Sequence, residues 1–194
     1  MARPKAPDHD AQRERILASA TQAFAQLGYA RASMSQLAQS CGTSKAGLYH
    51  YFPSKEALLF ESLDRYTRRL SERLHTVQAT ALPAHEELAH LVRALLTEYR
   101  DSRAHHIALL NDVKFLGPDQ REQIQAQERV IVQAVARSLH RVAPERLSGA
   151  HRTPTVMALL SMVNFTFAWL RPDGPMTYEQ YAELVIDLWT RSLA

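Results

Sequence analysis

Residues 32–58 read ASMSQLAQSCGTSKAGLYHYFPSKEAL, and this stretch decides which fold the chain is expected to adopt. Its apolar residues recur at helical spacing before and after Gly42, which predicts two short helices, at about 34–41 and 44–52, joined by a tight turn. Pro53 ends the second helix, because proline disfavours helical geometry in the residue before it. The stretch is therefore a candidate helix-turn-helix.

The second of these two helices is the one expected to read DNA. A helix fits the major groove, and the residues at its N-terminus reach the edges of the bases. Leu48 and Phe52 lie one turn apart and would hold this helix against the core, which leaves a cation, hydroxyls and aromatic rings facing outward. Gly47 would leave room for close approach of the backbone. The pattern alone leaves an alternative open, in which two ordinary short helices belong to an all-α core.

Helical periodicity continues on both sides of this stretch. A helix at about 10–27 ends where Gly28 is suited to the left-handed conformation of a helix C-terminus. Ser54 is suited to cap the next helix, in which apolar residues from Leu59 to Val77 form one continuous seam. Further helices are expected at about 83–101, 103–116, 119–142, 155–170 and 178–193. The sequence thus predicts an all-α fold of about nine helices.

The composition is that of a globular helical protein. Of the 194 residues, 46% are apolar, and only 6 glycines and 9 prolines interrupt the chain, which favours long helices over many short strands. The single cysteine, Cys41, cannot form an internal disulfide, and residues 1–10 lack the apolar stretch of a secretory signal. No apolar run approaches the ~18 residues of a membrane span. We therefore expect no membrane segment and a cytoplasmic protein.

The basic charge is concentrated near the N-terminus. The first 55 residues contain seven basic and three acidic side chains, whereas the remainder contains 16 basic and 17 acidic ones. A concentrated basic segment attracts a polyanion such as DNA. A solvated basic tail would give the same distribution, so the charge alone does not distinguish these two interpretations.

The stretch 32–58 resembles the DNA-binding signature of the tetracycline-repressor (TetR) family of bacterial transcriptional regulators. The resemblance rests on the motif Ser-Lys-x-Gly-Leu-Tyr-x-x-Phe-x-x-Lys-x-x-Leu, which occupies residues 44–58. Strong similarity covers about 12–60, and beyond it the architecture is similar: a long linking helix and then a variable helical domain. Family members usually have histidine directly before the phenylalanine. Here that place holds Tyr51 and His50 precedes it, so the contact made there can differ.

The resemblance implies a flexible arm at 1–9, a helix-turn-helix DNA-binding domain at 10–53 and a ligand-binding and dimerisation domain at 54–194. It implies double-stranded DNA with a palindromic operator as a partner, with Lys55 as a phosphate anchor and Tyr49 and Tyr51 as contacts to the DNA backbone. The full set of implied DNA contacts is Arg31, Ser33, Met34, Thr43, Ser44, Lys45, Gly47, Tyr49, His50, Tyr51 and Lys55.

Two helical faces near the C-terminus are so apolar that they must be buried against something. An intramolecular core accounts for a share of this surface. The resemblance implies that the two helices also pair with their symmetry mates in a homodimer, which spaces two reading helices one DNA turn apart. The interface candidates are Val156, Leu159, Leu160, Val163, Phe167, Tyr181, Leu184, Val185, Leu188 and Trp189.

A ligand pocket is expected among the helices between the linking helix and about residue 170. Asn111 and Asn164 interrupt apolar helices, and a buried polar group needs a partner, which a ligand could supply. Ordinary core packing is the simpler explanation for each residue taken singly. Segments 109–116 and 169–177 are similar to family members associated with breakdown of fatty acids, steroids or aromatic acids, which implies a small apolar or acyl-CoA-type effector. The pocket candidates are Tyr66, Leu70, Tyr99, His106, Leu110, Asn111, Phe115, Met162, Phe165 and Trp169.

No cofactor, metal site or catalytic function is expected. His105 and His106 are adjacent, so on a helix they point about 100° apart, and His85 and His90 are five residues apart, a poor spacing for a shared ion. The chain shows no nucleophile elbow, phosphate-binding glycine loop or metal-ligand spacing, which leaves a helical enzyme as a remote alternative.

The expected mechanism is allosteric derepression. An effector would enter between the helices and tilt the long linking helix, so that the two reading helices lose register with the operator. Two alternatives stay open: a DNA-binding regulator without a small-molecule ligand, and activation instead of repression.

Overall fold

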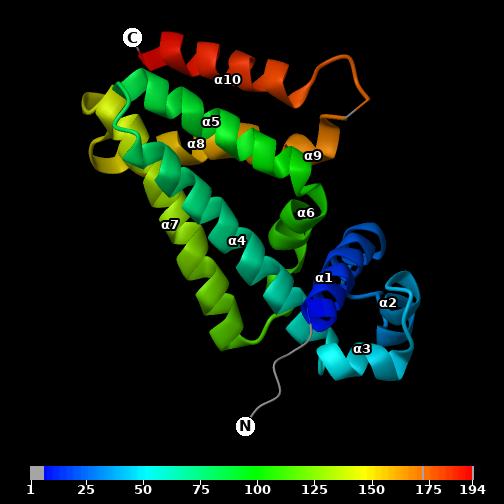
Figure 1. The fold of residues 1–194 in the computed structure, drawn as a ribbon. Coiled ribbons are helices and arrows are strands. Elements are labelled where there is room, and N and C mark those ends of the chain that lie inside the picture. The colour runs from blue at the N-terminus through cyan, green and yellow to red at the C-terminus, as the bar shows by residue number, and fades with distance from the viewer. Residues whose placement is uncertain (1–6, 172, 194) are drawn as a thin grey trace. The chain divides into compact units, whose positions relative to one another are not determined.

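The computed structural model describes residues 7–171 and 173–193, which form helices and connecting segments without β-strands (Figure 1). The predicted all-α class is confirmed. The α-helices are α1 (Pro7–Leu27), α2 (Met34–Ser40), α3 (Lys45–Tyr51), α4 (Lys55–Ala79), α5 (Ala84–Asp101), α6 (Arg103–Asp112), α7 (Pro118–Val142), α8 (Arg152–Asn164), α9 (Thr166–Trp169) and α10 (Tyr178–Leu193). Short 3₁₀ helices are η1 (Val113–Phe115), η2 (Glu145–Leu147) and η3 (Gly149–His151).

The caps of the first helices follow from local sequence. Ser33 and Gln36 form a capping box at the start of α2, in which each side chain accepts the backbone N–H of the other at 3.3 and 2.9 Å. Ser44 and Ser54 each accept the N–H three residues further on, at 2.9 and 3.0 Å. Gly28 has a φ of +79°, the left-handed conformation expected after α1.

The predicted helix at 155–170 consists of two helices. α8 begins earlier, at Arg152, and ends at Asn164, and the short α9 begins at Thr166. The side chain of Thr166 is fully buried and donates to the carbonyl of Val163 at 2.8 Å. This hydrogen bond gives the buried hydroxyl a backbone partner at the point where the helical geometry changes.

Two other boundaries also differ from the prediction. The first turn of α1 begins at Pro7, inside the segment expected to be a flexible arm, and residues 1–6 of that arm lie outside the described residues. The helix expected to continue to residue 116 ends at Asp112, and η1 follows it.

The described helices form two compact units. The N-terminal unit extends to Tyr66 and includes residues 104–124, so it contains α1 to α3, the first part of α4, α6, η1 and the start of α7. The C-terminal unit contains residues 67–103 and those from 125 onward. The predicted domain boundary after residue 53 therefore falls within the N-terminal unit, because later segments pack on the DNA-binding helices.

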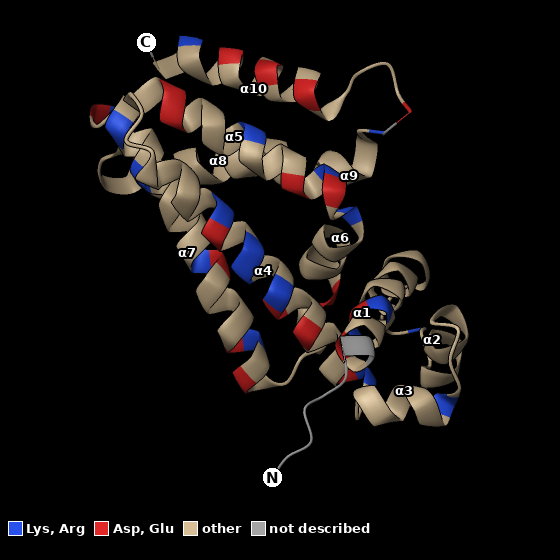
Figure 2. Cartoon of the chain, in the orientation of Figure 1, with Lys and Arg blue, Asp and Glu red and all other residues tan. Residues whose placement is uncertain are grey.

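Each unit has its own apolar core. In the N-terminal unit the most deeply buried side chains, at 0 to 1% exposure, include Ile16, Phe24, Leu37, Leu48 and Phe52. In the C-terminal unit α10 runs alongside α5 (Figure 1). Acidic residues recur along α10, and one arginine lies in its last turn (Figure 2). Glu179 and Glu183 pair with Arg100 and Arg93 of α5, so α10 packs through ion pairs as well as through its apolar side.

Candidate DNA-binding site

The helix α3 is fixed by two inward anchors. Leu48 and Phe52 are 0% and 1% exposed, as the one-turn spacing predicted. Lys45 and His50 are exposed, and Tyr49 keeps 45% of its surface accessible. Lys45 is the only charged residue of this helix and lies in its first turn (Figure 2). The outward face of α3 therefore presents a cation, a phenol and an imidazole.

Gly47 is required by the N-terminus of α3 itself. A Cβ atom at this position would lie 2.5 Å from Thr43 Oγ1 and 3.2 Å from Ser44 Oγ. Ser44 Oγ is the atom that caps the helix, so a larger residue would disturb the cap. The structure thus supplies a local reason for glycine beside the expected one, close approach of DNA.

The other residues expected to touch DNA have varied surroundings. Arg31 is exposed and donates from Nε to a carbonyl of α1 at 2.7 Å. Ser33 is exposed with its hydroxyl engaged in the capping box, and Met34 and Tyr51 are half-buried. The His9 ring lies 4.8 Å from the Tyr51 ring, a neighbour that the motif did not reveal because it depends on where α1 begins.

Lys55 is engaged inside the protein. Its Nζ donates to the carbonyls of Tyr29 and Ala32 at 2.8 and 2.9 Å, and it lies 4.2 Å from the centroid of the Tyr29 ring. An ammonium has three N–H donors, so one donor at most is left for a phosphate. The phosphate-anchor role stays a prediction, and the observed role of Lys55 is to tie the start of α4 to the turn between α1 and α2.

The same turn also contacts residues that follow α6. The Asp112 carboxylate is buried near the Tyr29 backbone, which lowers the pKa of this carboxyl. The Phe115 ring stacks on the Tyr29 ring with centroids 5.0 Å apart. Glu56 accepts the Gly117 N–H at 2.7 Å. The segment from α6 to α7 is therefore bonded directly to the DNA-binding helices.

Lys55, Tyr29, Asp112 and Phe115 form one cluster, which we call the Tyr29 junction. Burial raises the pKa of the Asp112 carboxyl, although the charges of Lys114 and Lys55 and the nearby Tyr29 backbone oppose the rise. Burial also raises the pKa of the Tyr29 phenol, and the negative charges of Glu56 and Asp112 add to it. The junction thus holds a carboxylate at a free-energy cost.

Part of the basic charge near the N-terminus is neutralised within the fold. The Arg13 guanidinium lies 4.2 Å from the Phe52 ring centroid and pairs with Glu61 at 2.5 Å. Lys55 is bound to backbone carbonyls. Arg31 and Lys45 are exposed and able to meet an anion. The positive surface offered by the described residues is smaller than the charge count suggested.

The expected pocket residues of the N-terminal unit are divided between interior and surface. Tyr66 and His106 are buried, and the Tyr66 hydroxyl lies 3.2 Å from His106 Nδ1. Leu110 and Phe115 are 38% and 39% exposed. Asn111 is exposed and donates to a carbonyl of its own helix at 3.0 Å, so it is not a buried group in need of a partner.

The expected pocket residues of the C-terminal unit show a similar division. Tyr99 is buried, and its hydroxyl donates to Asn164 Oδ1 at 2.8 Å. Burial raises the pKa of the Tyr99 phenol, and the nearby Glu128 carboxylate adds to the rise. Glu128, which the sequence analysis missed, itself has a pKa raised by burial. Leu70 is buried, Met162 is half-buried, and Phe165 and Trp169 are 61% and 51% exposed.

Most of the expected dimer residues are covered by the chain itself. Six of them are between 0% and 7% exposed, namely Val156, Leu159, Leu160, Val163, Tyr181 and Val185. Phe167 and Trp189 are half-buried. Leu184 and Leu188 are 42% and 48% exposed, one turn apart on α10. Of the ten candidates, these two leave the largest apolar surface for a second copy.

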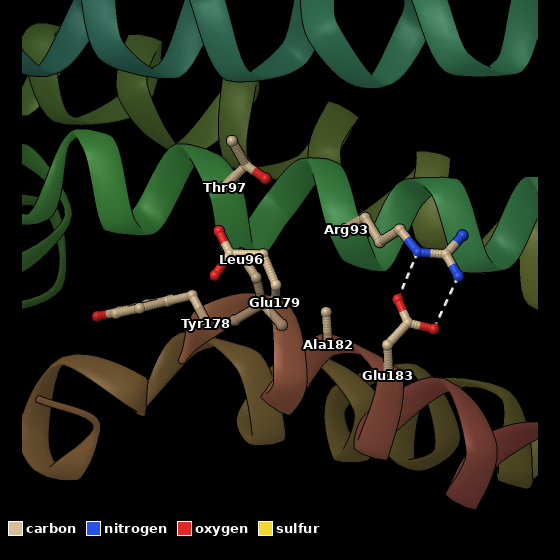
Figure 3. A pocket seen from close by; sticks show the side chains of 7 residues that line it. All are labelled: Arg93, Leu96, Thr97, Tyr178, Glu179, Ala182 and Glu183. Carbon is tan, nitrogen blue, oxygen red and sulfur yellow. Dashed lines mark hydrogen bonds and ion pairs between the residues drawn. The ribbon is translucent and has the colours of Figure 1, made fainter. Parts of the chain in front are cut away.

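A small cavity of about 160 Å³ lies between parts of α5 and α10 (Figure 3). Arg93 and Glu183 close one side of it through a bidentate ion pair, with distances of 2.6 and 2.9 Å. Tyr178 is buried beside it, with no hydrogen-bond partner for its hydroxyl within residues 7–171 and 173–193. None of the expected pocket residues lines this cavity.

The part of the chain that the structure describes was compared with the requirements of a membrane-spanning helix and of a metal site. None of its helices combines the length and apolarity needed to cross a bilayer. No group of three or more His, Cys, Asp or Glu side chains there is arranged to hold a metal ion.

These features define a helix-turn-helix DNA-binding protein with a second helical unit. Residues 16–61 match the family model for bacterial regulatory proteins of the tetR family, and residues 81–193 match the tetracyclin repressor-like C-terminal domain. The chain belongs to the TetR family of transcriptional regulators, which are DNA-binding proteins and not enzymes.

Solved structures agree with this assignment over most of the chain. A TetR-family regulator from Bordetella parapertussis 12822 is 30% identical, with 91% of this chain and 93% of that chain covered and a TM-score of 0.87. AibR, solved in complex with isovaleryl coenzyme A and operator DNA, is 27% identical, with 91% and 97% covered and a TM-score of 0.81.

Similarity to curated relatives is more local. The activator FasR of Mycolicibacterium smegmatis is 27% identical over 179 residues, which is 90% of this chain and 79% of FasR. Matches to other curated regulators cover between 22% and 45% of those proteins' own length.

We expect Lys55→Met to lower stability, because the methionine keeps the apolar stem and removes both charged hydrogen bonds. A loss of about 1–3 kcal/mol is expected for such bonds. Urea denaturation of the full chain measures it. The matched control is Lys45→Met, which removes an exposed cation. It should leave stability unchanged and lower the salt slope of DNA binding by ~0.9. Unchanged stability of Lys55→Met would contradict the internal role.

We expect Asp112→Asn to raise the thermal midpoint near neutral pH. A pKa raised in the folded state stabilises the fold below the ordinary value of 3.8, and this contribution is lost as the pH rises through the folded pKa. The amide does not titrate and has nearly the same shape as the carboxyl group. Melting curves of both proteins should therefore converge as the pH falls toward 3.8. A variant that is less stable than the wild type at neutral pH would show that the carboxylate is favourable.

Proposed function

We propose that the protein is a homodimeric, ligand-responsive repressor that leaves a palindromic operator when a small apolar or acyl-CoA-type compound binds. The observation that carries this proposal is the division of α3 into a buried face, Leu48 and Phe52, and an exposed face with Lys45, Tyr49 and His50. A helix anchored in this way can enter the major groove without unfolding its core.

In this proposal Lys45 and the cap at Ser44 approach a phosphate at the N-terminus of α3, where the free N–H groups favour an anion. Tyr49 and His50 lie further along the exposed face and supply hydrogen-bonding groups toward the groove. Arg31 and Ser33 border α2 and extend the contact to the DNA backbone. Thr43, Gly47, Met34 and Tyr51 support this surface.

The homodimer is proposed to form through the outer side of α10. Leu184 and Leu188 remain exposed along one edge of the apolar face of α10, while Tyr181 and Val185 on the same face fill the chain's own core. An exposed apolar pair on a helix that already has a buried face is costly in water unless a second surface covers it. A second copy related by a two-fold axis would cover it and pair two reading helices.

An effector of the acyl-CoA type is supported by the similarity to a ligand-bound regulator. The pairs Tyr66–His106 and Tyr99–Asn164 bond within their own units, so neither pair needs a ligand as a partner. AibR, which is similar over most of the chain, was solved with isovaleryl coenzyme A and operator DNA. Activation is a second candidate, favoured by the similarity to FasR, which is an activator.

The DNA-binding and dimer proposals are tested together by Leu188→Glu. We expect the wild type to behave as a dimer of 22.0 kDa chains and to prefer a palindromic duplex from the DNA upstream of its gene over a scrambled duplex. The charge on α10 should give monomers and weaken operator binding at least tenfold. The matched control is Val130→Glu, an equally exposed apolar residue on α7. Light scattering and fluorescence anisotropy provide the readouts. A monomeric wild type, or equal affinity for both duplexes, would refute the proposal.

The effector proposal is tested by adding isovaleryl coenzyme A to the preformed operator complex. A coupling of about 1–3 kcal/mol would weaken operator affinity about 5–150-fold. Anisotropy titrations with and without the compound measure this change, and free coenzyme A serves as the control. Operator affinity that is unchanged by saturating amounts of a compound that raises the melting temperature would show binding without release.

A further inference from the structure

A cationic surface cavity lies in the C-terminal unit where α7, η2 and α8 meet. Its volume is about 370 Å³, which is within the range of small-molecule sites. Four of its six lining residues are basic or imidazole side chains, and none is acidic. The lining consists of Ala136, Arg137, His140, Arg141, Leu147 and Arg152.

The arginines of this cavity differ in how their charge is compensated. Arg141 is ion-paired with the buried Glu87 carboxylate. Arg137 donates to the neutral amide oxygen of Gln78 at 3.0 Å and has no ion pair within the described residues. Arg152 forms neither a hydrogen bond nor an ion pair across residues 7–171 and 173–193. Two guanidinium groups in one concave surface are therefore available to an anion.

An apolar cavity adjoins the cationic one. It has a volume of about 250 Å³ and shares Ala136 and Arg152 with its neighbour. Val132, Val156 and Met157 form its apolar walls, with Gln133 and Thr153 at the rim. The two cavities together offer a charged end and a hydrocarbon-compatible end to a single ligand.

The start of α8 adds to the positive field. This helix has 13 residues, and Arg152 is its only charged residue. His151, at the N-cap position, makes no side-chain hydrogen bond to the first turn. Pro154 lacks an N–H, so the first-turn N–H groups that can favour an anion belong to Arg152 and Thr153, which both line these cavities.

We infer that these two cavities bind an amphiphilic organic anion, with a carboxylate or phosphate head between Arg137 and Arg152 and a hydrocarbon chain against Val132 and Met157. A bidentate guanidinium matches either head group. The apolar walls distinguish this site from a simple anion-binding patch, because covering them with a hydrocarbon chain removes apolar surface from water, which is favourable. The inference goes beyond the proposed function, since it requires neither operator binding nor release.

Calorimetric titration of the full chain without DNA tests the inference. The probes are n-octyl phosphate and octanoate, which distinguish the two head groups. Inorganic phosphate represents the head group alone, and 1-octanol represents the hydrocarbon chain alone. We expect one or both amphiphiles to bind the wild type more tightly than either half. The double variant Arg137→Ala/Arg152→Ala should weaken that binding at least tenfold. The matched control is Arg171→Ala, an exposed arginine outside both cavities, which should bind as the wild type does.

A second variant separates the two ends of the site. Val132→Ser should weaken binding of n-octyl phosphate while leaving any binding of inorganic phosphate unchanged. Circular dichroism melts of every variant check that it folds. Equal amphiphile affinity of the wild type and the double arginine variant would overturn the inference. So would inorganic phosphate or 1-octanol binding as tightly as the amphiphiles, or no binding of any probe.

Discussion

The Lys55 ammonium donates to two backbone carbonyls in the turn between α1 and α2. A turn of this kind leaves carbonyls without helical partners, and such groups need a donor when water is partly excluded. The donor comes from the first turn of α4, where a positive charge is unfavourable for the helix dipole. The two charge-assisted hydrogen bonds offset that cost. The position of α2, and through it of α3, therefore depends on a side chain that belongs to α4.

The Tyr29 junction extends this dependence to a third segment. The Tyr29 carbonyl accepts a hydrogen bond from Lys55, and the Tyr29 ring stacks on Phe115, with the Asp112 carboxylate near the Tyr29 backbone. Asp112 and Phe115 belong to the end of α6 and to η1, so the DNA-binding helices share one cluster with that segment. A displacement of η1 by the width of an aromatic ring would break the stacking of Phe115 on Tyr29 and remove one contact that holds the turn before α2. In the N-terminal unit, the turn before α2 and the segment after α6 therefore depend on the same few atoms.

Local signals in the sequence were sufficient for the helix-turn-helix. The cap at Ser54, the left-handed Gly28 and the inward pair Leu48 and Phe52 depend on neighbours within a few residues, so spacing alone predicts them. Roles that depend on distant segments were not accessible in this way. The carbonyl partners of Lys55 lie more than 20 residues earlier in the chain. The motif implied only a DNA phosphate as the partner of Lys55.

The apolar faces of α8 and α10 show why periodicity could not separate core from interface. A 3.6-residue repeat identifies the side of a helix that avoids water but not the surface that covers it. On α10, Tyr181 and Val185 meet the chain's own core while Leu184 and Leu188 remain exposed, although all four are equally apolar in a helical projection. The distinction requires tertiary packing. Once that packing is known, Leu184 and Leu188 are identified as the part of the apolar face of α10 that the chain's own core leaves exposed.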